Sequence, residues 1–316
     1  MKVGYEMKTT LVLAHYYTIP EVQAMADYVG DSLELAMIAQ REKADRIVFA
    51  GVKFMAETAK LLNPEAEVIL PDERSTCSLV TQTDTSSLKR WRDRYADHAH
   101  VTYINSSIET KSMADWVVTS RNVDDIVAHL YESGRQVIFS PDRNMGAYLN
   151  HQYGYNMPLW SAVCEVHDLF NAERVQQILS EVKANESGPF LIAHPESPLP
   201  VLKQADFIGS TKQMLQWISD IDADQRPIYV ATEEGLLYNM RHLRADLDIR
   251  QAPIYTGCQC NACPYMKRNT VQRVSDAING EGFLIDYLDM NHIEQARRPI
   301  ERMLDFDVQQ ASGHAA

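Results

Sequence analysis

The chain has 316 residues, 45% of them hydrophobic and 23% charged, which is typical of a folded globular protein with two domains or three small ones. Its formal net charge of −13, from 30 basic and 43 acidic side chains, argues against a nucleic-acid or anionic-membrane partner. No apolar stretch has membrane-spanning length, and the N-terminal run lacks a cleavage site, so we expect a cytoplasmic protein with reduced cysteines.

A short phrase, Ala-Asp-aromatic-apolar ending in a hydroxyl, recurs three times along the chain. Each copy follows a β-rich run that we expect to be a buried parallel strand. The step from a polar residue near the end of that run to the closing hydroxyl is 17 residues in every copy, which indicates triplication. The runs and phrases are TLVLAHYY (10–17) with MADYVGDS (25–32), HVTYINS (100–106) with MADWVVTS (113–120), and PFLIAHPE (189–196) with QADFIGST (204–211).

Each phrase is followed by a helical pattern and then by a second strand, RIVFAG, QVIFSPD or PIYVATEE, so each copy predicts a βαβ unit. The predicted class is therefore α/β: three similar three-layer αβα domains in a pseudo-threefold arrangement around a central cleft. We assign residues 1–95, joined by the C-terminal tail 271–316, to the first repeat, 96–186 to the second and 187–270 to the third.

Ligands of parallel α/β sheets bind beyond the carboxyl ends of the strands, near helix N-termini. The strand ends carry pairs of polar residues two apart, which therefore share one face of the strand: His15 and Tyr17, Tyr103 and Asn105, and His194 and Glu196. Hydroxyl groups stand where each following helix is expected to begin, so they either cap the helix or help to hold phosphate or carboxylate; these are Ser32, Ser120 and Thr211.

The cysteines follow the same repeat. Cys77 lies 45 residues after Ser32 and Cys164 lies 44 after Ser120, while the third copy offers Cys258, Cys260 and Cys263. One thiolate from each copy favours a soft-metal site. Three thiolate ligands without a matching fourth ligand suit a [4Fe–4S] cluster with one open iron. A structural zinc held by the Cys-x-Cys-x-x-Cys run is the rival hypothesis.

Several long motifs together resemble quinolinate synthase, over nearly the whole chain from His15 to the closing IEQARRPIERML. They are HYY (15–17), ADYVGDSLELA (26–36), FAGVKFMAETAKLLNP (49–64), PDRNMGAYL (141–149), LWSAVCEVH (159–167), HPE (194–196), ADFIGST (205–211), ATEEGLLYNM (231–240) and CPYMKRNT (263–270).

The resemblance implies a cytoplasmic enzyme of de novo NAD biosynthesis. Such an enzyme condenses iminoaspartate with dihydroxyacetone phosphate to quinolinate, phosphate and water, and is linked to the L-aspartate oxidase that supplies iminoaspartate. The resemblance also implies one [4Fe–4S] cluster per chain, whose open iron acts as a Lewis acid in the dehydration. The cluster ligands carried over by motif are Cys77, Cys164 and Cys263, although the repeat spacing by itself favours Cys258 as the third ligand.

The resemblance further implies a set of substrate-binding residues, namely His15, Ser32, Tyr103, Asn105, Ser120, His194, Glu196 and Thr211. Glu196 is the expected proton-transfer residue because it is the one carboxylate among the strand-end pairs. Tyr17 and Tyr103 are expected to shuttle a proton or orient the intermediate, and His15 and His194 to bind carboxylates or polarise a carbonyl. Two alternatives stay open: an iron–sulfur hydro-lyase acting on another hydroxy acid, and a cluster-based sensor of a phosphorylated ligand.

Overall fold

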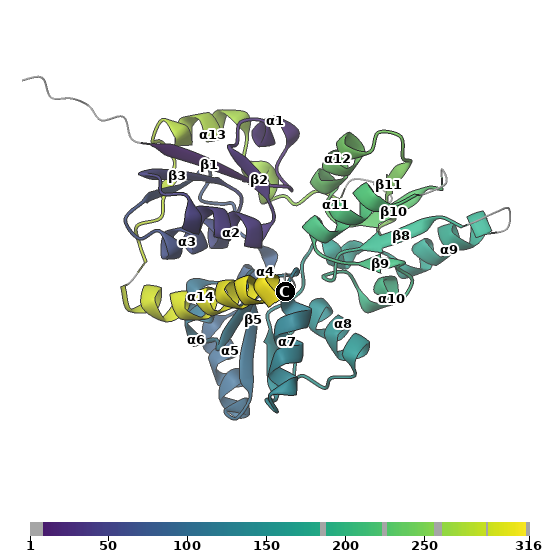
Figure 1. Cartoon of the computed structure of the whole chain (residues 1–316), viewed down its shortest axis with the longest axis horizontal. Coiled ribbons are helices and arrows are strands. Elements are labelled where there is room, and N and C mark those ends of the chain that lie inside the picture. Colours follow the sequence, from purple (N-terminus) through teal and green to yellow (C-terminus); the bar gives the residue numbers. More distant parts are fainter. Residues whose placement is uncertain (1–8, 184–187, 223–225, 256–260, 289, 314–316) are drawn as a thin grey trace, which may run out of the picture.

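The structure is a computed structural model that describes residues 9–183, 188–222, 226–255, 261–288 and 290–313. Within these residues the strands form three separate sheets with helices around them, which we call the first, second and third units (Figure 1). The predicted α/β class with three sheets is confirmed, whereas the pseudo-threefold arrangement and the domain bounds stay predictions. No helix of the described residues is both long and apolar enough to cross a membrane.

The first unit has five strands in the order β12-β4-β3-β1-β2, all parallel except β12, which is antiparallel to β4. The strands are β1 (Thr10–His15), β2 (Tyr28–Gly30), β3 (Arg46–Ala50), β4 (Glu67–Leu70) and β12 (Phe283–Leu284). The helices are α1 (Pro20–Gln23), α2 (Ser32–Arg41), α3 (Lys53–Leu62) and α13 (Val271–Ile278).

The second unit has three parallel strands in the order β6-β5-β7. The strands are β5 (Ala99–Tyr103), β6 (Trp116–Val118) and β7 (Val137–Ser140). The helices of this part of the chain are α4 (Ser78–Thr81), α5 (Thr85–Arg92), α6 (Ile108–Met113), α7 (Val123–Glu132) and α8 (Arg143–Tyr153), with short 3₁₀ turns at Asp93–Tyr95 and His167–Leu169.

The third unit has four parallel strands in the order β11-β10-β8-β9. The strands are β8 (Phe190–Ala193), β9 (Phe207–Ile208), β10 (Ile228–Ala231) and β11 (Ile249–Gln251). The helices are α9 (Ala172–Lys183), α10 (Leu199–Leu202), α11 (Thr211–Asp220) and α12 (Glu234–Leu243), and a 3₁₀ turn, Met266–Arg268, follows in the chain.

The first strands are buried on both faces, as their unbroken apolar runs predict. In β1, Leu11 and Leu13 pack in the cluster that holds residues of α2 and α3, whereas Val12 and Ala14 pack in the cluster that holds residues of α1 and α13. Helices therefore cover both faces of the first sheet, and Figure 1 shows the three layers.

The recurring phrase folds in the same way in all three units. Its aromatic and apolar residues form a short edge strand, β2, β6 or β9, which the sequence analysis did not predict. The Asp of the phrase exchanges two hydrogen bonds with the neighbouring first strand. The Oδ2 atoms of Asp27, Asp115 and Asp206 each accept, at 2.8 Å, from the backbone N–H of Val12, His100 and Leu191, whose carbonyl groups accept from the same three Asp N–H groups.

The C-terminal tail contacts two units. Its strand β12 pairs with β4 of the first sheet, while the helix α14 (Met290–Gly313) packs along α6 and β6 of the second unit and touches α3. Figure 1 shows α14 in yellow, running between the first and second units. The tail therefore closes the chain by joining these two units.

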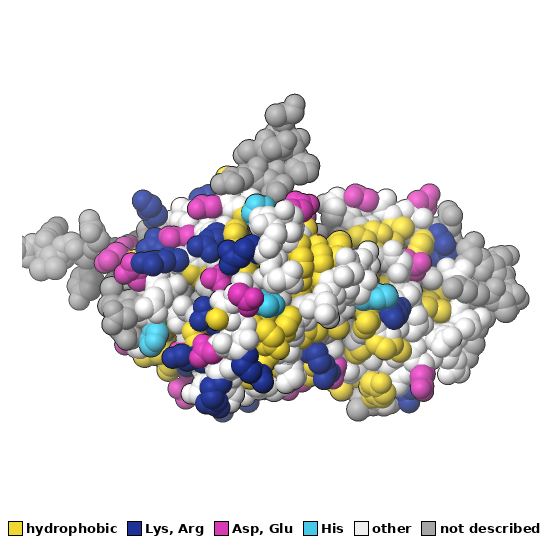
Figure 2. All heavy atoms as spheres, turned by 90° about the horizontal axis from the view of Figure 1, so that it is seen from below, with side chains coloured by type: hydrophobic (Ala, Val, Ile, Leu, Met, Phe, Trp, Pro, Cys, Tyr) yellow, Lys and Arg dark blue, Asp and Glu magenta, His cyan; other side chains and the backbone are white. Residues whose placement is uncertain are grey.

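The molecular face seen from below carries charges of both signs. Figure 2 shows Lys and Arg side chains interspersed with Asp and Glu on the left part of this face, and apolar side chains toward its middle. This face is therefore not covered by a uniformly basic surface.

Candidate active site

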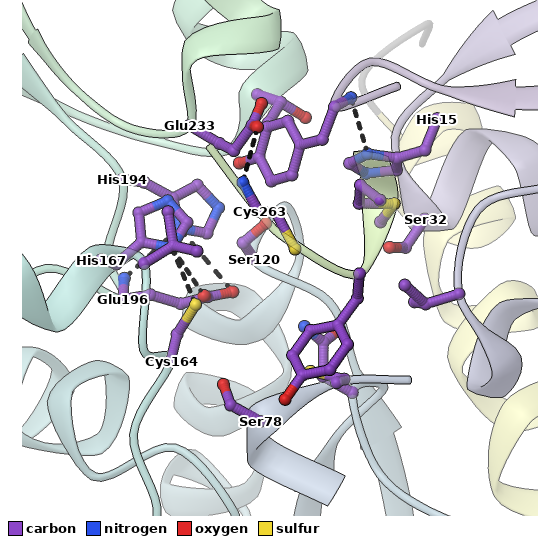
Figure 3. A pocket seen from close by; sticks show the side chains of 18 of the residues that line it. His15, Ser32, Ser78, Ser120, Cys164, His167, His194, Glu196, Glu233 and Cys263 are labelled. Carbon is purple, nitrogen blue, oxygen red and sulfur yellow. Dashed lines mark hydrogen bonds and ion pairs between the residues drawn. The ribbon is translucent and has the colours of Figure 1, made fainter. Parts of the chain in front are cut away.

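Every candidate side chain that lies among the described residues lines one cavity, to which all three units contribute and whose empty volume is about 720 Å³. Figure 3 shows His167, His194 and Glu196 on one side of this space and His15 and Ser32 on the other. The polar candidates in its lining are His15, Tyr17, Ser32, Tyr103, Asn105, Ser120, His194, Glu196 and Thr211, and the cysteines are Cys77, Cys164 and Cys263. Cys258 and Cys260 lie outside the described residues.

The strand ends place one polar group from each unit at the cavity. His15 is the last residue of β1, Tyr103 is the last residue of β5, and His194 directly follows β8. Because the strands of each sheet are parallel, their carboxyl ends lie at the same edge, where ligands of such sheets bind. The repeat spacing therefore brought equivalent residues of three sheets to one place.

His15 and His194 are neutral hydrogen-bond donors. Burial lowers the pKa of each imidazole from 6.5 to about 3 despite the nearby Glu196 carboxylate. The backbone N–H of Tyr17 donates to Nδ1 of His15 at 3.1 Å, and that of Glu196 donates to Nδ1 of His194 at 3.4 Å. With Nδ1 accepting, the ring proton of a neutral imidazole is on Nε2, so each ring offers an uncharged N–H donor.

The three hydroxyl residues do not cap their helices. Asp31 caps α2, accepting from the Glu34 N–H, and Ser210 caps α11 in a capping box with Gln213. The N-cap of α7 is Asn122, without a side-chain capping bond. The capping alternative for Ser32, Ser120 and Thr211 is therefore wrong, and all three line the cavity instead.

Three thiols share the cavity and repel one another as thiolates. Burial raises the pKa of all three cysteines, that of Cys263 to about 12, and the partner thiols raise the pKa of Cys77 and Cys164 further. Three neighbouring thiolates in a buried place need a cation, so this donor set fits a metal group. Ligand atoms of Cys164, His167 and Glu196 also lie within 4.8 Å of one another, a second grouping that could hold a metal ion.

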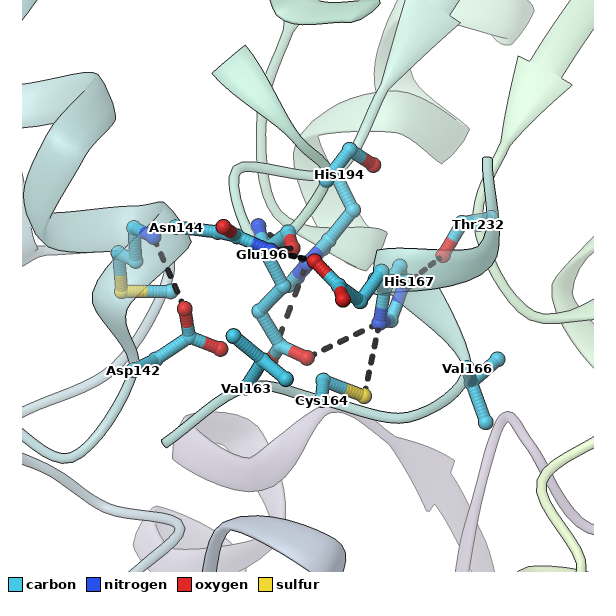
Figure 4. Close-up of polar contacts among 12 residues, drawn as sticks. Asp142, Asn144, Val163, Cys164, Val166, His167, His194, Glu196 and Thr232 are labelled. Carbon is cyan, nitrogen blue, oxygen red and sulfur yellow. Dashed lines mark hydrogen bonds and ion pairs between the residues drawn. The ribbon is translucent and has the colours of Figure 1, made fainter. Parts of the chain in front are cut away.

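Glu196 is a buried carboxylate, 3% exposed. Burial alone would raise its pKa, but the His167 and His194 rings and the Tyr103 hydroxyl hold the pKa well below its usual range. Tyr103 donates to Oε1 at 2.6 Å, and His167 Nδ1 lies 2.9 Å from Oε2. The carboxylate is therefore ionised at neutral pH and accepts hydrogen bonds, and Figure 4 shows the His167 ring beside it.

Two cavity residues carry acceptor atoms without a partner. Among the described residues, neither Oδ1 of Asn105 nor Oδ2 of Asp31 has a hydrogen-bond partner, although both atoms are buried. Buried acceptors usually have partners, so these two atoms point to ligand groups that donate.

The sequence analysis missed several residues that shape the site. His167 stands three residues after Cys164, a Cys-x-x-His spacing that could have drawn attention to it, and its ring stacks on His194 with centroids 4.7 Å apart. Glu233 accepts from the Cys263 N–H at 2.9 Å and pairs with Lys267 at 2.8 Å. Lys267 also donates to the Tyr17 carbonyl, which ties Cys263 to the first unit.

Comparisons with known proteins show which family the chain belongs to. The family described as "Quinolinate synthetase A protein" matches residues 2–305. A quinolinate synthase of Nostoc punctiforme is 39% identical over 298 residues, 94% of this chain and 90% of the relative. Those of Gloeothece citriformis and Chloroherpeton thalassium are 40% and 38% identical over 296 residues, in each case 93% of this chain and 89% of the relative. This chain therefore belongs to the quinolinate synthase family, whose members are enzymes of NAD biosynthesis.

Proposed function

We propose that this protein condenses iminoaspartate with dihydroxyacetone phosphate to form quinolinate, phosphate and water. The observation that carries the proposal is the cavity. Neutral imidazole donors, free hydroxyls at two helix starts and an ionised glutamate from the first and third units surround one space, to which the second unit adds Tyr103 and Asn105. Both substrates are anions with carbonyl or imine groups, which such donors bind. The family membership supports the same reaction.

The substrates' anionic groups are bound by Ser32, Ser120 and Thr211. Ser32 and Thr211 are the first residues of α2 and α11, each ten residues long, so their hydroxyls stand at the positive ends of helix dipoles. The Nε2–H donors of His15 and His194 bind a carboxylate or polarise a carbonyl without adding charge. The free Oδ1 of Asn105 accepts from an imine or hydroxyl group.

Glu196 is the base that removes carbon-bound protons. Its carboxylate is ionised and lies within the cavity lining, which a base for C–H bonds requires. Burial and Glu196 itself raise the pKa of Tyr17 and Tyr103, so both tyrosines keep their hydroxyl protons. They are therefore donors that orient the intermediate or pass a proton to a leaving oxygen.

We propose that Cys77, Cys164 and Cys263 hold one [4Fe–4S] cluster per chain. The repulsion that the three cysteines would exert on one another as thiolates supports a cationic metal group bound by all three rather than by one of them. When bound, such a cluster has one iron without a protein thiolate, which supplies Lewis acidity toward a substrate oxygen. A cytoplasmic location and a link to L-aspartate oxidase, which would supply iminoaspartate, are parts of this proposal.

The test is anaerobic purification of the full chain, followed by iron and sulfide analysis and product analysis. We expect about four irons and four sulfides per chain, and quinolinate from iminoaspartate and dihydroxyacetone phosphate. Replacing Cys77, Cys164 or Cys263 by Ser should remove most of the iron, whereas Cys258→Ser and Cys260→Ser are the controls that should retain it. Full iron in any one of the first three variants would remove that cysteine from the ligand set, and a dehydrated hydroxy acid in place of quinolinate would favour a hydro-lyase.

A further inference from the structure

A buried carboxylate outside the cavity lining is held by arginines. Asp72 follows β4 and is 7% exposed. Its Oδ1 accepts from the Arg74 backbone N–H at 2.9 Å and from Arg74 Nε at 3.0 Å, while its Oδ2 accepts from Arg74 Nη2 at 2.9 Å. Nη1 of Arg273 lies 2.9 Å from the same Oδ2, and Nη1 of Arg268 lies 3.9 Å from it. The Arg74 hydrogen bonds lower the pKa of Asp72 from 3.8 to about 2, so this carboxyl is ionised at neutral pH.

These arginines connect two segments that each carry a cysteine of the cavity. Asp72 stands five residues before Cys77. Arg268 ends the 3₁₀ turn that follows Cys263, and it stands five residues after that cysteine. Nη1 of Arg273 donates to the Arg268 carbonyl at 2.9 Å, and the same nitrogen lies 2.9 Å from the Asp72 carboxylate. One guanidinium nitrogen therefore bridges the segment before Cys77 and the segment after Cys263.

The loop between Asp72 and Cys77 is short and hydrogen-bonded. Ser75 is fully buried, its N–H donates to the Asp72 carbonyl at 3.0 Å, and its carbonyl accepts from the Lys53 N–H at 2.7 Å. Cys77 is the N-cap residue of α4, and its carbonyl accepts from the Val80 N–H at 3.0 Å. A shift of Asp72 is therefore passed on to Cys77, because the backbone between them is held by these hydrogen bonds.

We propose that Asp72 is a positioning residue, which holds the Cys77 loop against the turn after Cys263 at the separation in which both thiolates bind one metal group. The inference rests on the proposed function, in which Cys77, Cys164 and Cys263 share a cluster. Contacts behind the ligands of a metal orient those ligands and influence how tightly the metal is held. A buried carboxylate also keeps its cations close, because separation would leave its charge without a partner. Asp72 therefore acts on the metal group through the cysteines and without touching it.

The test measures how fast iron leaves the anaerobically purified, iron-loaded full chain for a ferrous chelator. Asp72→Asn keeps the size of the side chain and removes its charge, so iron should leave at least about 10-fold faster than from the wild type. Arg273→Met should have a similar effect, and it is the second variant in case Asp72→Asn does not fold. Arg273→Lys keeps a cation and should release iron more slowly than Arg273→Met. The matched control is Glu67→Gln at the opposite end of β4, which breaks the 2.7 Å ion pair with Arg46 and should leave the release rate unchanged.

A double variant shows whether the two groups act as one contact. Asp72→Asn combined with Arg273→Met should release iron no more than about twofold faster than the faster single variant, because either change alone already breaks the contact. Wild-type release rates in both single variants, an equal acceleration in Glu67→Gln, or multiplied effects in the double variant would each overturn the inference. A wild-type chain that holds no iron would contradict the proposed cluster and this inference with it, whereas the release rates of the variants concern Asp72 alone.

Discussion

At the scale of single residues, the site depends on how burial acts differently on acids and bases. Burial keeps His15 and His194 neutral, because a charged imidazole would lose its hydration. Glu196 is as deeply buried, yet its charge persists because Tyr103 and His167 hydrogen-bond to the ionised form. One cavity therefore combines uncharged donors with an ionised acceptor.

The first prediction concerns Glu196. Glu196→Gln keeps the size of the side chain but removes the base and one acceptor, so we expect turnover to fall by about 10² to 10⁴ with iron content unchanged. Tyr103→Phe removes one hydrogen bond and leaves the carboxylate, so its loss should be smaller. Single-turnover formation of quinolinate measures both. A Glu196→Gln enzyme as fast as wild type would transfer the role of base to Tyr17 or Tyr103.

At the scale of elements, the starts of α2 and α11 each have one residue that caps the helix and a next residue that lines the cavity. In α11, Ser210 accepts from the Gln213 N–H and Gln213 Oε1 accepts from the Ser210 N–H, while Thr211, next in the chain, lines the cavity. In α2, Asp31 caps and Ser32 lines the cavity. This separation leaves the cavity-lining hydroxyl available without weakening the helix.

The second prediction uses this neighbouring pair. Ser210→Ala should lower the free energy of unfolding by about 1 kcal/mol, measured by urea denaturation, with little change in KM. Thr211→Ala should leave stability nearly unchanged and weaken substrate binding by about 1 to 2 kcal/mol, the value of a lost charge-assisted hydrogen bond. If both variants changed stability and neither changed binding, Thr211 would have no role in holding an anion.

At the scale of the whole molecule, folding removes neutral imidazoles from water in all three units. Burial lowers the pKa of His15 and His194 to about 3 and that of His100 to about 4, from an ordinary value of 6.5. The unfolded chain therefore binds more protons than the folded one below pH 6.5. Stability is fully present above that pH and is lost progressively as the pH falls toward the folded-state values.

The third prediction is the size of this effect. When the pH falls from 7.5 to 5.5, each of the three histidines should lower the free energy of unfolding by about 1.4 kcal/mol, which is roughly 4 kcal/mol for the three together. Urea denaturation of the full chain at both pH values measures the difference. His100→Gln should lose about one third of the pH dependence, because its site no longer titrates. An unchanged dependence in that variant would show that His100 is not one of the groups responsible.

Much of the fold and the candidate site could be predicted from the sequence, because both depend on spacing along the chain. Apolar runs mark strands buried on both faces, and a spacing of 17 residues brings His15 with Ser32, and His194 with Thr211, to equivalent strand and helix ends. Asp27 and its equivalents recur for a structural reason, because each binds the backbone of the neighbouring strand. Such contacts recur in every repeat, so the residues that make them form a pattern in the sequence.

The contacts between units could not be predicted in this way. Thr232 contacts Tyr17, which is 215 positions away in the sequence, and Lys267 contacts the Tyr17 carbonyl, which is 250 positions away. No periodic pattern in the sequence predicts either contact. The positions of His167 and Glu233 at the cavity, and the fact that Ser210 caps α11 while Thr211 lines the cavity, were likewise decided by the tertiary structure. Spacing along a chain reports which residues share a face of one element. Which faces of separate sheets meet depends on how their apolar surfaces pack, and that packing determines the partners and charge of each group in the site.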